Sequence, residues 1–144
     1  MKIVITSGYF DPLHVGHLEC FKLAKELGDR LLVIINSDKQ SKLKKGYYFM
    51  NEQDRFKIIT SLIYVNDAMV SIDKDQTQCE TLKFLAKYYK GMELIFAKGG
   101  DRNRKNIPEA KICKKYGIKI VDGLGKKIRS SSEIVKKAKH LNNI

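Results

Sequence analysis

Short apolar runs alternate along this chain with longer amphipathic segments, and this alternation restricts the fold more than any other feature of the sequence. The apolar runs, which are rich in β-branched residues, predict strands over residues 2–7, 30–36, 67–72, 93–98 and 118–121. The segments between them repeat apolar residues at helical spacing. Strands that alternate with helices in this way predict a parallel sheet with helices on both faces.

Residues with known end preferences mark the helix boundaries. Gly28 and Gly117 each follow an amphipathic segment, as glycine commonly does at helix C-termini. Asn51 precedes another segment, and Ser130 with Glu133 forms a capping box before the last one. Helices are therefore predicted over residues 15–27, 52–64, 77–90, 108–116 and 131–140, and the lysine-rich residues 37–49 are predicted to be a loop.

The 144 residues are expected to form a single domain, residues 1–144, with a doubly wound, Rossmann-like sheet of five parallel strands. In such sheets ligands bind beyond the carboxyl ends of the strands, where the strand order reverses. The longest apolar run, residues 31–35, is far shorter than the roughly 20 residues that a membrane span needs.

Three cysteines, Cys20, Cys79 and Cys113, lie far apart in the sequence. An odd number without paired spacing argues against a disulfide framework and against a zinc site. Each cysteine falls in a helical pattern, where it is expected to serve as a small apolar side chain. This usage is typical of a reducing compartment, and the protein is expected to be cytoplasmic.

Most of the net charge of +12 belongs to the C-terminal third. Residues 98–144 hold 14 of the 28 Lys and Arg but only 4 of the 16 Asp and Glu. A basic region of this kind suits nucleic acid, an acidic membrane or a polyphosphate substrate, and an ordinary lysine-rich surface explains it equally well. Aromatic residues do not interleave with the basic stretch and no nucleic-acid motif occurs, which argues against nucleic acid as a partner.

Residues 8–17 read Gly-Tyr-Phe-Asp-Pro-Leu-His-Val-Gly-His and follow the first predicted strand directly. His14 and His17 are three residues apart where a helix begins, so both can face the same way. The helix N-terminus adds backbone N–H donors and a positive dipole end. Gly8 and Gly16 would let an anion approach the backbone closely. Together these features favour a phosphate site over a metal site.

This segment resembles the Gly-x-Phe-Asp-x-x-His-x-Gly-His signature of the cytidylyltransferase-like nucleotidyltransferases. Residues 36–38, 45–46 and 50–55 are similar to the choline- and ethanolamine-phosphate cytidylyltransferases, whereas residues 98–101 (Lys-Gly-Gly-Asp) are more similar to the adenylyltransferase that activates heptose 1-phosphate. Residues 129–134 resemble the closing motif of the family, a Ser/Thr cluster that opens the last helix.

The resemblance implies an enzyme that joins a nucleoside triphosphate to a phosphorylated alcohol or sugar and releases pyrophosphate, with Mg²⁺ accompanying the triphosphate. CTP is the favoured donor. The alternatives are an adenylyltransferase that uses ATP on a sugar 1-phosphate, another adenylyltransferase branch of the family, and a non-catalytic basic module that binds nucleic acid. Homodimers are common among family members of this size, and the apolar run at residues 47–50 is expected to form either the dimer contact or a lid, with the dimer favoured.

The resemblance also implies roles for individual residues in transfer. His14 and His17 would contact the α- and β-phosphates, and Lys45 or its neighbour Lys44 would close over them from the predicted loop, which is expected to be mobile without a ligand. The implied nucleotide-binding set is Gly8, Tyr9, Phe10, Gly16, Lys98, Gly99, Asp101, Ser130 and Ser131.

The remaining roles fall to an arginine and three aspartates. Arg55 would bind a phosphate, and Asp38 would hold an acceptor hydroxyl or serve as a turn residue. Asp11 is expected to orient the loop that contains it. Asp101 would contact the nucleotide or Mg²⁺, or cap a turn.

The chain departs from the family pattern before its Ser/Thr cluster. The glycerol- and choline-phosphate enzymes usually carry Arg-Thr-Glu-Gly-Ile there, whereas this chain has Gly-Lys-Lys-Ile-Arg at residues 125–129. The family arginine would fall near Gly125, which weakens the choline- or glycerol-phosphate interpretation. Lys126, Lys127 or Arg129 would have to supply the missing charge.

Overall fold

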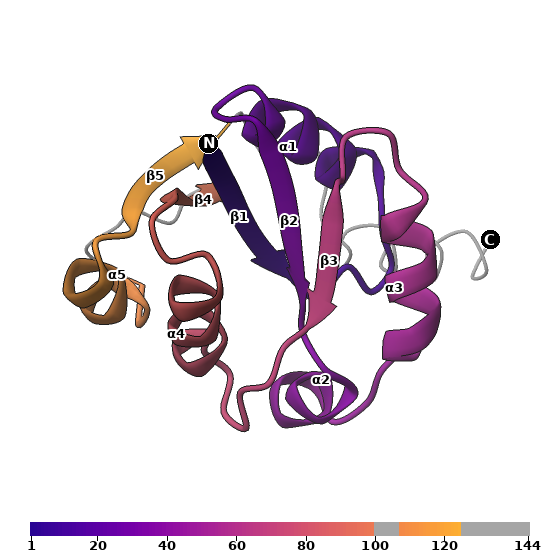
Figure 1. Ribbon diagram of the computed structural model, residues 1–144. Helices are drawn as coiled ribbons and strands as arrows, with labels where there is room; N and C mark the ends of the chain where they lie inside the picture. Colours follow the sequence, from indigo (N-terminus) through magenta and orange to yellow (C-terminus); the bar gives the residue numbers. More distant parts are fainter. Residues whose placement is uncertain (100–106, 125–144) are drawn as a thin grey trace, which may run out of the picture.

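A computed structural model describes residues 1–99 and 107–124 of the chain (Figure 1). Within these residues, one parallel sheet has the strand order β3-β2-β1-β4-β5, which confirms the predicted fold class. The strands are β1 (Lys2–Gly8), β2 (Arg30–Ile35), β3 (Asp67–Val70), β4 (Glu93–Gly99) and β5 (Lys119–Leu124). The chain moves outward from β1 to β3 and then returns to β4, so the strand order reverses between β1 and β4.

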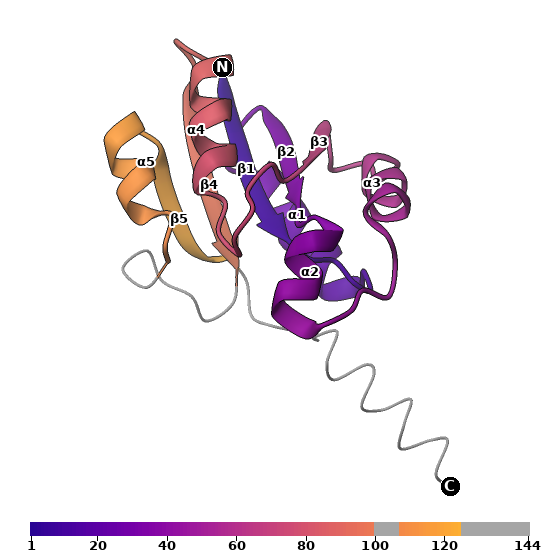
Figure 2. The same cartoon turned by 90° about the horizontal axis from the view of Figure 1, so that it is seen from below.

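Helices pack on both faces of the sheet (Figure 2). The helices α1 (Val15–Lys25) and α3 (Glu52–Thr60) contribute to the core on one face, and α4 (Cys79–Tyr88) and α5 (Ala110–Tyr116) contribute to the core on the other. Strand β2 supplies alternate residues to the two cores, which is why its sequence is a continuous apolar run. Each helix ends within a few residues of its predicted boundary, and Gly117 ends α5 as predicted.

The predicted loop over residues 37–49 is wrong, because a helix, α2 (Asp38–Lys45), occupies most of it. Ser37 and Gln40 form a reciprocal capping box at its start, and Gly46 ends it with a φ of 84°, a left-handed conformation that favours glycine. Two helices therefore follow β2 instead of one. Figure 1 shows α2 beyond the arrowheads of β1 and β3, at the carboxyl edge of the sheet.

The predicted helix over residues 131–140 lies outside the described residues. Among the helices that are described, none is both long enough and apolar enough to cross a membrane.

Candidate functional site

The carboxyl ends of β1 and β4 meet where the strand order reverses. There the ammonium group of Lys98 donates a hydrogen bond to Ser7 Oγ at 3.0 Å. Lys98 therefore lies at the crevice where doubly wound sheets bind their ligands. Gly99, from the same predicted set, is the last residue of β4.

His14 and His17 open helix α1 and satisfy its N-terminus with their rings. His14 is the N-cap residue, and its Nδ1 accepts a hydrogen bond from the backbone N–H of Gly16 at 3.1 Å. Nδ1 of His17 accepts one from the backbone N–H of His14, also at 3.1 Å. The two rings stack with their centroids 3.8 Å apart. The structure thus brings the two histidines together on one side of the helix start, as their spacing predicts.

These hydrogen bonds determine which ring nitrogen carries the proton. A neutral imidazole has one N–H and one acceptor nitrogen. Because Nδ1 is the acceptor in both rings, the neutral form of each histidine is protonated at Nε2. Burial, with a smaller contribution from the neighbouring charge of His14, lowers the pKa of His17 to about 3. At neutral pH His17 is therefore an uncharged hydrogen-bond donor through Nε2.

Phe10 packs against His17. Its ring is 4% exposed and makes edge contacts with His17 and Phe21, at centroid distances of 5.0 Å and 5.3 Å. Its φ of 52° is unusual for a bulky side chain. A Cβ at Gly8 would lie 2.7 Å from Phe10 Cζ, so the ring itself requires a glycine there. The structure thus gives a packing reason for Gly8, where the sequence pattern suggested the close approach of an anion.

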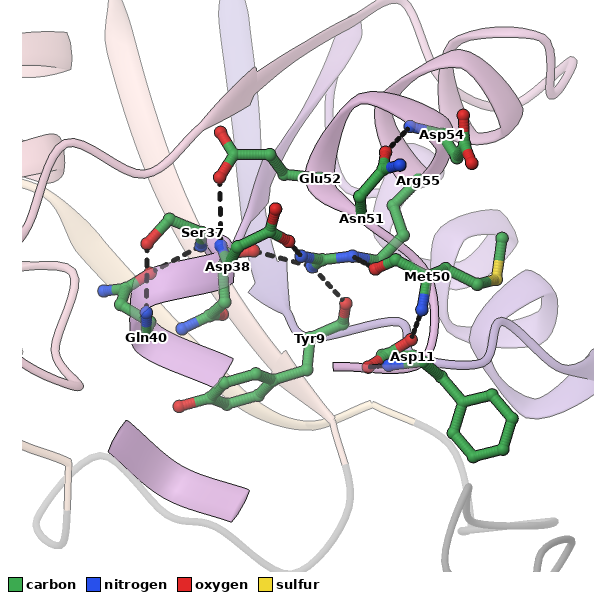
Figure 3. A network of polar contacts seen from close by, with 12 residues as sticks. Tyr9, Asp11, Ser37, Asp38, Gln40, Met50, Asn51, Glu52, Asp54 and Arg55 are labelled. Atoms are coloured by element: carbon green, nitrogen blue, oxygen red, sulfur yellow. Dashed lines mark hydrogen bonds and ion pairs between the residues drawn. The ribbon is translucent and has the colours of Figure 1, made fainter. Parts of the chain in front are cut away.

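Asp11 ties the β1–α1 connection to the segment that follows α2. Its buried carboxylate accepts hydrogen bonds from the backbone N–H groups of Phe49, at 2.8 Å, and Met50, at 2.6 Å. Figure 3 shows the carboxylate of Asp11 turned toward the Met50 nitrogen. Asp11 therefore orients a loop, which is the role predicted for it, and both of its oxygens are engaged.

Arg55 is placed differently from its prediction as a phosphate ligand. Its side chain is fully buried, and its guanidinium donates to the backbone carbonyls of Met50, Tyr9 and Asn36 at 2.9, 2.8 and 2.6 Å. A fourth hydrogen bond, at 2.9 Å, goes to Asp38 Oδ1 (Figure 3). Arg55 and Asp38, both predicted to bind substrate, are therefore paired with each other. The buried guanidinium also links the residues after β1 (Tyr9), the residues after β2 (Asn36) and the segment before α3 (Met50).

The last turn of α2 brings two predicted lysines to the same place. Lys45 Nζ donates to the backbone carbonyl of Asp11 at 3.3 Å. Lys44 Nζ lies 4.3 Å from the centroid of the Tyr9 ring, and Lys45 Nζ lies 5.8 Å from it. The ammonium groups of Lys44 and Lys45 thus lie beside the segment that carries the histidines, although the lysines are far from that segment in the sequence.

Two residues of the site, Ser7 and Asn36, had no role predicted from the sequence pattern. Asn36 is buried, donates its backbone N–H to the Gly8 carbonyl at 2.9 Å and accepts from Arg55 through its own carbonyl. Both residues lie at the carboxyl end of a predicted strand, and this position was the available signal for their role.

Several predicted site residues lie outside residues 1–99 and 107–124. These are Asp101, Arg129, Ser130 and Ser131, together with the candidate substitutes for the family arginine, Lys126 and Lys127.

The groups around residues 7–17 suit an anion. Lys98, Lys44 and Lys45 contribute cations, His17 contributes a neutral N–H donor, and helix α1 contributes its positive dipole end. The nearby carboxylates of Asp11 and Asp38 accept hydrogen bonds from the protein itself. Within the part of the chain that the structure describes, no three His, Cys, Asp or Glu side chains form a group that could hold a metal ion. Phosphate is the ligand class that this chemistry favours.

Comparison with known proteins gives consistent matches. The sequence profile of the cytidylyltransferase-like family matches residues 5–140. Bifunctional protein HldE of Blochmanniella floridana is 35% identical over 120 residues, which are 83% of this chain and 24% of that protein. FAD synthase of Pyrococcus abyssi (strain GE5 / Orsay) is 43% identical over 68 residues, 46% of each chain. The chain thus corresponds to less than half the length of these curated relatives.

A solved structure shares the fold over most of its length. The lipopolysaccharide core biosynthesis protein from Thermoplasma volcanium GSS1 aligns with a TM-score of 0.69 and 27% sequence identity, covering 85% of this chain and 95% of that chain.

Proposed function

The chain belongs to the cytidylyltransferase-like family, and from this premise we propose that it transfers a nucleoside monophosphate from a nucleoside triphosphate to a phosphorylated alcohol or sugar. One observation carries the proposal. Two stacked histidines hold the N-terminus of α1 through Nδ1, and α2 and β4 bring ammonium groups to residues 7–11 of the same connection.

In the proposed reaction a phosphate oxygen of the acceptor attacks the α-phosphorus of the triphosphate. A new P–O bond forms, the bond between the α-phosphorus and its bridging oxygen breaks, and pyrophosphate leaves with the bonding electrons. Negative charge grows on the bridging and equatorial oxygens during the transfer. We assign the Nε2–H groups of His14 and His17 and the ammonium groups of Lys44, Lys45 and Lys98 to these oxygens, because donors held in place before the reaction lower its barrier.

The triphosphate would bring Mg²⁺ with it. Asp11 accepts hydrogen bonds at both carboxylate oxygens and Asp38 accepts one from Arg55, so neither carboxylate is assigned to the ion in this proposal. No step in the proposed reaction is therefore assigned to the metal.

We propose ATP as the donor, with CTP as the second candidate. Two observations favour ATP: the similarity to FAD synthase, whose product contains an adenine nucleotide, and the Lys-Gly-Gly-Asp segment at residues 98–101. The similarity of residues 36–38 and 50–55 to the choline- and ethanolamine-phosphate enzymes favours CTP. The acceptor is proposed only as a phosphorylated alcohol or sugar.

Pyrophosphate release tests the proposal. The purified chain would be screened with each of four nucleoside triphosphates against a panel of phosphorylated alcohols and sugars, with and without Mg²⁺. We expect release with one donor, ATP before CTP, in the presence of one acceptor class. His17→Asn is the control that keeps an acceptor at the helix cap and removes Nε2. If no combination releases pyrophosphate from folded protein, the proposed function is wrong. If the variant is as active as the parent, Nε2 of His17 takes no part in the transfer.

A homodimer remains a proposal. Tyr47 and Phe49 are 52% and 63% exposed, which is a large apolar area for the surface of a single chain. Light scattering over a range of concentrations would detect the dimer, and Phe49→Lys would be expected to weaken it. If the mass is monomeric at high concentration, this face is not a dimer contact.

A further inference from the structure

Two lysines of one helix share a single aromatic ring. Lys44 Nζ lies 4.3 Å and Lys45 Nζ 5.8 Å from the centroid of Tyr9, both within the roughly 6 Å range of a cation–π interaction. Like charges on neighbouring residues would otherwise keep the two ammonium groups apart. The electron-rich face of the ring offers both of them a favourable position beside residues 8–17.

The backbone of Tyr9 is held in place independently of the lysines. The carbonyl oxygen of Tyr9 accepts a 2.8 Å hydrogen bond from the buried guanidinium of Arg55. Figure 3 shows this carbonyl turned toward Arg55 and the ring extended away from it. The next residue, Phe10, has a left-handed backbone and a buried ring, so the chain on that side is also constrained. The backbone from which the Tyr9 side chain projects is therefore held by contacts that involve neither lysine.

The lysines reach the ring because of how α2 ends. Gly46 ends the helix with a φ of 84°, and the backbone N–H groups of Phe49 and Met50 bind the Asp11 carboxylate shortly afterwards. Lys45 Nζ also donates to the Asp11 carbonyl at 3.3 Å. The end of α2 is thus attached to the same short segment that carries Tyr9.

We propose that Tyr9 is a positioning residue, whose ring holds Lys44 and Lys45 ready to receive a triphosphate at the start of α1. The inference rests on the proposed function. A free lysine side chain has many rotamers and loses this freedom when it binds a phosphate. A ring that restricts the rotamers beforehand reduces that loss, and the triphosphate binds more tightly as a result. Tyr9 would act through the lysines and needs no contact with the reacting atoms.

The chain offers a matched control. Lys42 Nζ lies 5.5 Å from the ring centroid of Tyr48, so a second pair of the same kind sits on the neighbouring surface. Both pairs use lysines of α2, but Tyr48 lies in the segment after the helix, whereas Tyr9 belongs to the connection that carries the histidines. Tyr48→Leu therefore removes a cation–π pair without disturbing the proposed phosphate site.

The first experiment measures binding of inorganic tripolyphosphate by calorimetry, which requires no turnover. Tyr9→Leu is expected to weaken binding by about threefold to thirtyfold, the range that loss of a cation–π contact implies. Tyr9→Phe keeps the ring and is expected to remain within about twofold of the parent, as is Tyr48→Leu. If Tyr9→Leu binds as tightly as the parent, or if Tyr9→Phe binds as weakly as Tyr9→Leu, the proposal is overturned.

The second experiment observes the lysines directly. Reductive methylation with ¹³C-formaldehyde labels each lysine and preserves its charge, and methyl groups above an aromatic ring resonate upfield. We expect one upfield signal that disappears in Lys44→Arg and in Tyr9→Leu and persists in Tyr9→Phe. A Lys44 signal at the ordinary position in the parent protein would show that the ring does not hold this lysine.

The two experiments separate this inference from the proposed function. If the chain releases no pyrophosphate but Tyr9→Leu loses tripolyphosphate affinity and the upfield signal, the positioning role stands and the transfer reaction is wrong. If pyrophosphate is released while both readouts are unchanged in Tyr9→Leu, the reaction stands and the positioning role is wrong.

Discussion

At the scale of single residues, the two histidines combine a structural task with a chemical one. Each Nδ1 accepts a backbone hydrogen bond at the start of α1, and this leaves Nε2 as the protonated nitrogen of the neutral ring. An alanine at either position would leave one of these backbone N–H groups without its acceptor, and an unsatisfied helix N-terminus lowers stability.

Substitutions at His14 can separate the two tasks. His14→Asn retains an acceptor at the N-cap, so its free energy of unfolding should stay within about 0.5 kcal/mol of the parent, whereas His14→Ala should lose about 0.5–2 kcal/mol. Both variants lack Nε2 and should lose turnover by about 10²–10³. Urea denaturation and pyrophosphate release measure the two effects. Full activity in His14→Asn would remove this nitrogen from the transfer step.

The lowered pKa of His17 predicts how stability depends on pH. Below the ordinary value of 6.5 the unfolded chain binds a proton at this position, whereas the folded chain does so only near a pKa of about 3. The contribution of His17 to stability is therefore fully present above pH 6.5 and is lost as the pH falls from 6.5 toward 3. The stability difference between the parent and His17→Asn should change across this window and be constant above it. Denaturation at a series of pH values would measure it, and a difference that does not vary with pH contradicts the shift.

At the scale of elements, α2 and the residues after it are held by buried polar contacts. Gln40, which is fully buried, donates to the carbonyls of Asp75 and Thr77 at 2.7 and 3.0 Å. Asp11 binds the chain beyond the helix, and Arg55 joins Tyr9, Asn36 and Met50. The lysines of α2 are thus carried by an anchored helix, where the sequence pattern predicted a mobile loop.

Removal of the Arg55 guanidinium should break several of these buried contacts and lower the stability of the protein. Arg55→Met leaves three carbonyls and the Asp38 carboxylate without their donor, so the free energy of unfolding should fall by about 2–4 kcal/mol. Arg55→Lys should recover only part of the loss, because one ammonium cannot reach all four acceptors. The control is Lys57→Met on the exposed side of the same helix. If Arg55→Met unfolds at the same urea concentration as the control, the buried contacts contribute little.

At the scale of the whole molecule, basic residues fall into two groups with different surroundings. Lys111, Lys114 and Lys115 lie exposed along α5. Lys44, Lys45 and Lys98 lie at the carboxyl edge of the sheet, against residues 7–11. Charges more than about 10 Å from a ligand are screened at 0.1 M salt, whereas direct contacts persist.

Salt should therefore distinguish the two groups. Reversing the charge of Lys111, Lys114 and Lys115 together should weaken triphosphate binding at low salt and have little effect at high salt. Lys98→Met should weaken binding by about tenfold or more at both, since it removes a charge-assisted contact worth roughly 1.5–3 kcal/mol. Calorimetry at two salt concentrations measures both variants. An equal effect of the α5 lysines at high salt would place the binding site elsewhere.

Features that depend on neighbouring residues in the sequence could be predicted from it. The five strands and their parallel arrangement follow from apolar runs alternating with amphipathic segments, and the double burial of β2 follows from its unbroken apolar run. The placement of His14 and His17 on one side of a helix start follows from their three-residue spacing. Each of these features depends on periodicity or spacing within a short segment. Such a local pattern is present in the sequence regardless of the contacts that the segment makes after folding.

Only the tertiary structure decided what the polar residues of the site do. Helix α2 was not predicted because its buried residues are Gln40 and Ser41, which leaves it without an apolar stripe. The capping box of Ser37 and Gln40 was a local signal for it. Arg55 was predicted as a phosphate ligand from the resemblance to the family, whereas a charged side chain on a helix is normally exposed. Its burial depends on acceptors from Tyr9, Asn36, Asp38 and Met50. The contacts of the Tyr9 ring with Lys44 and Lys45 likewise depend on chain segments that only folding brings together. Such contacts join residues up to 46 positions apart, and a local pattern contains no information about partners that only folding brings together.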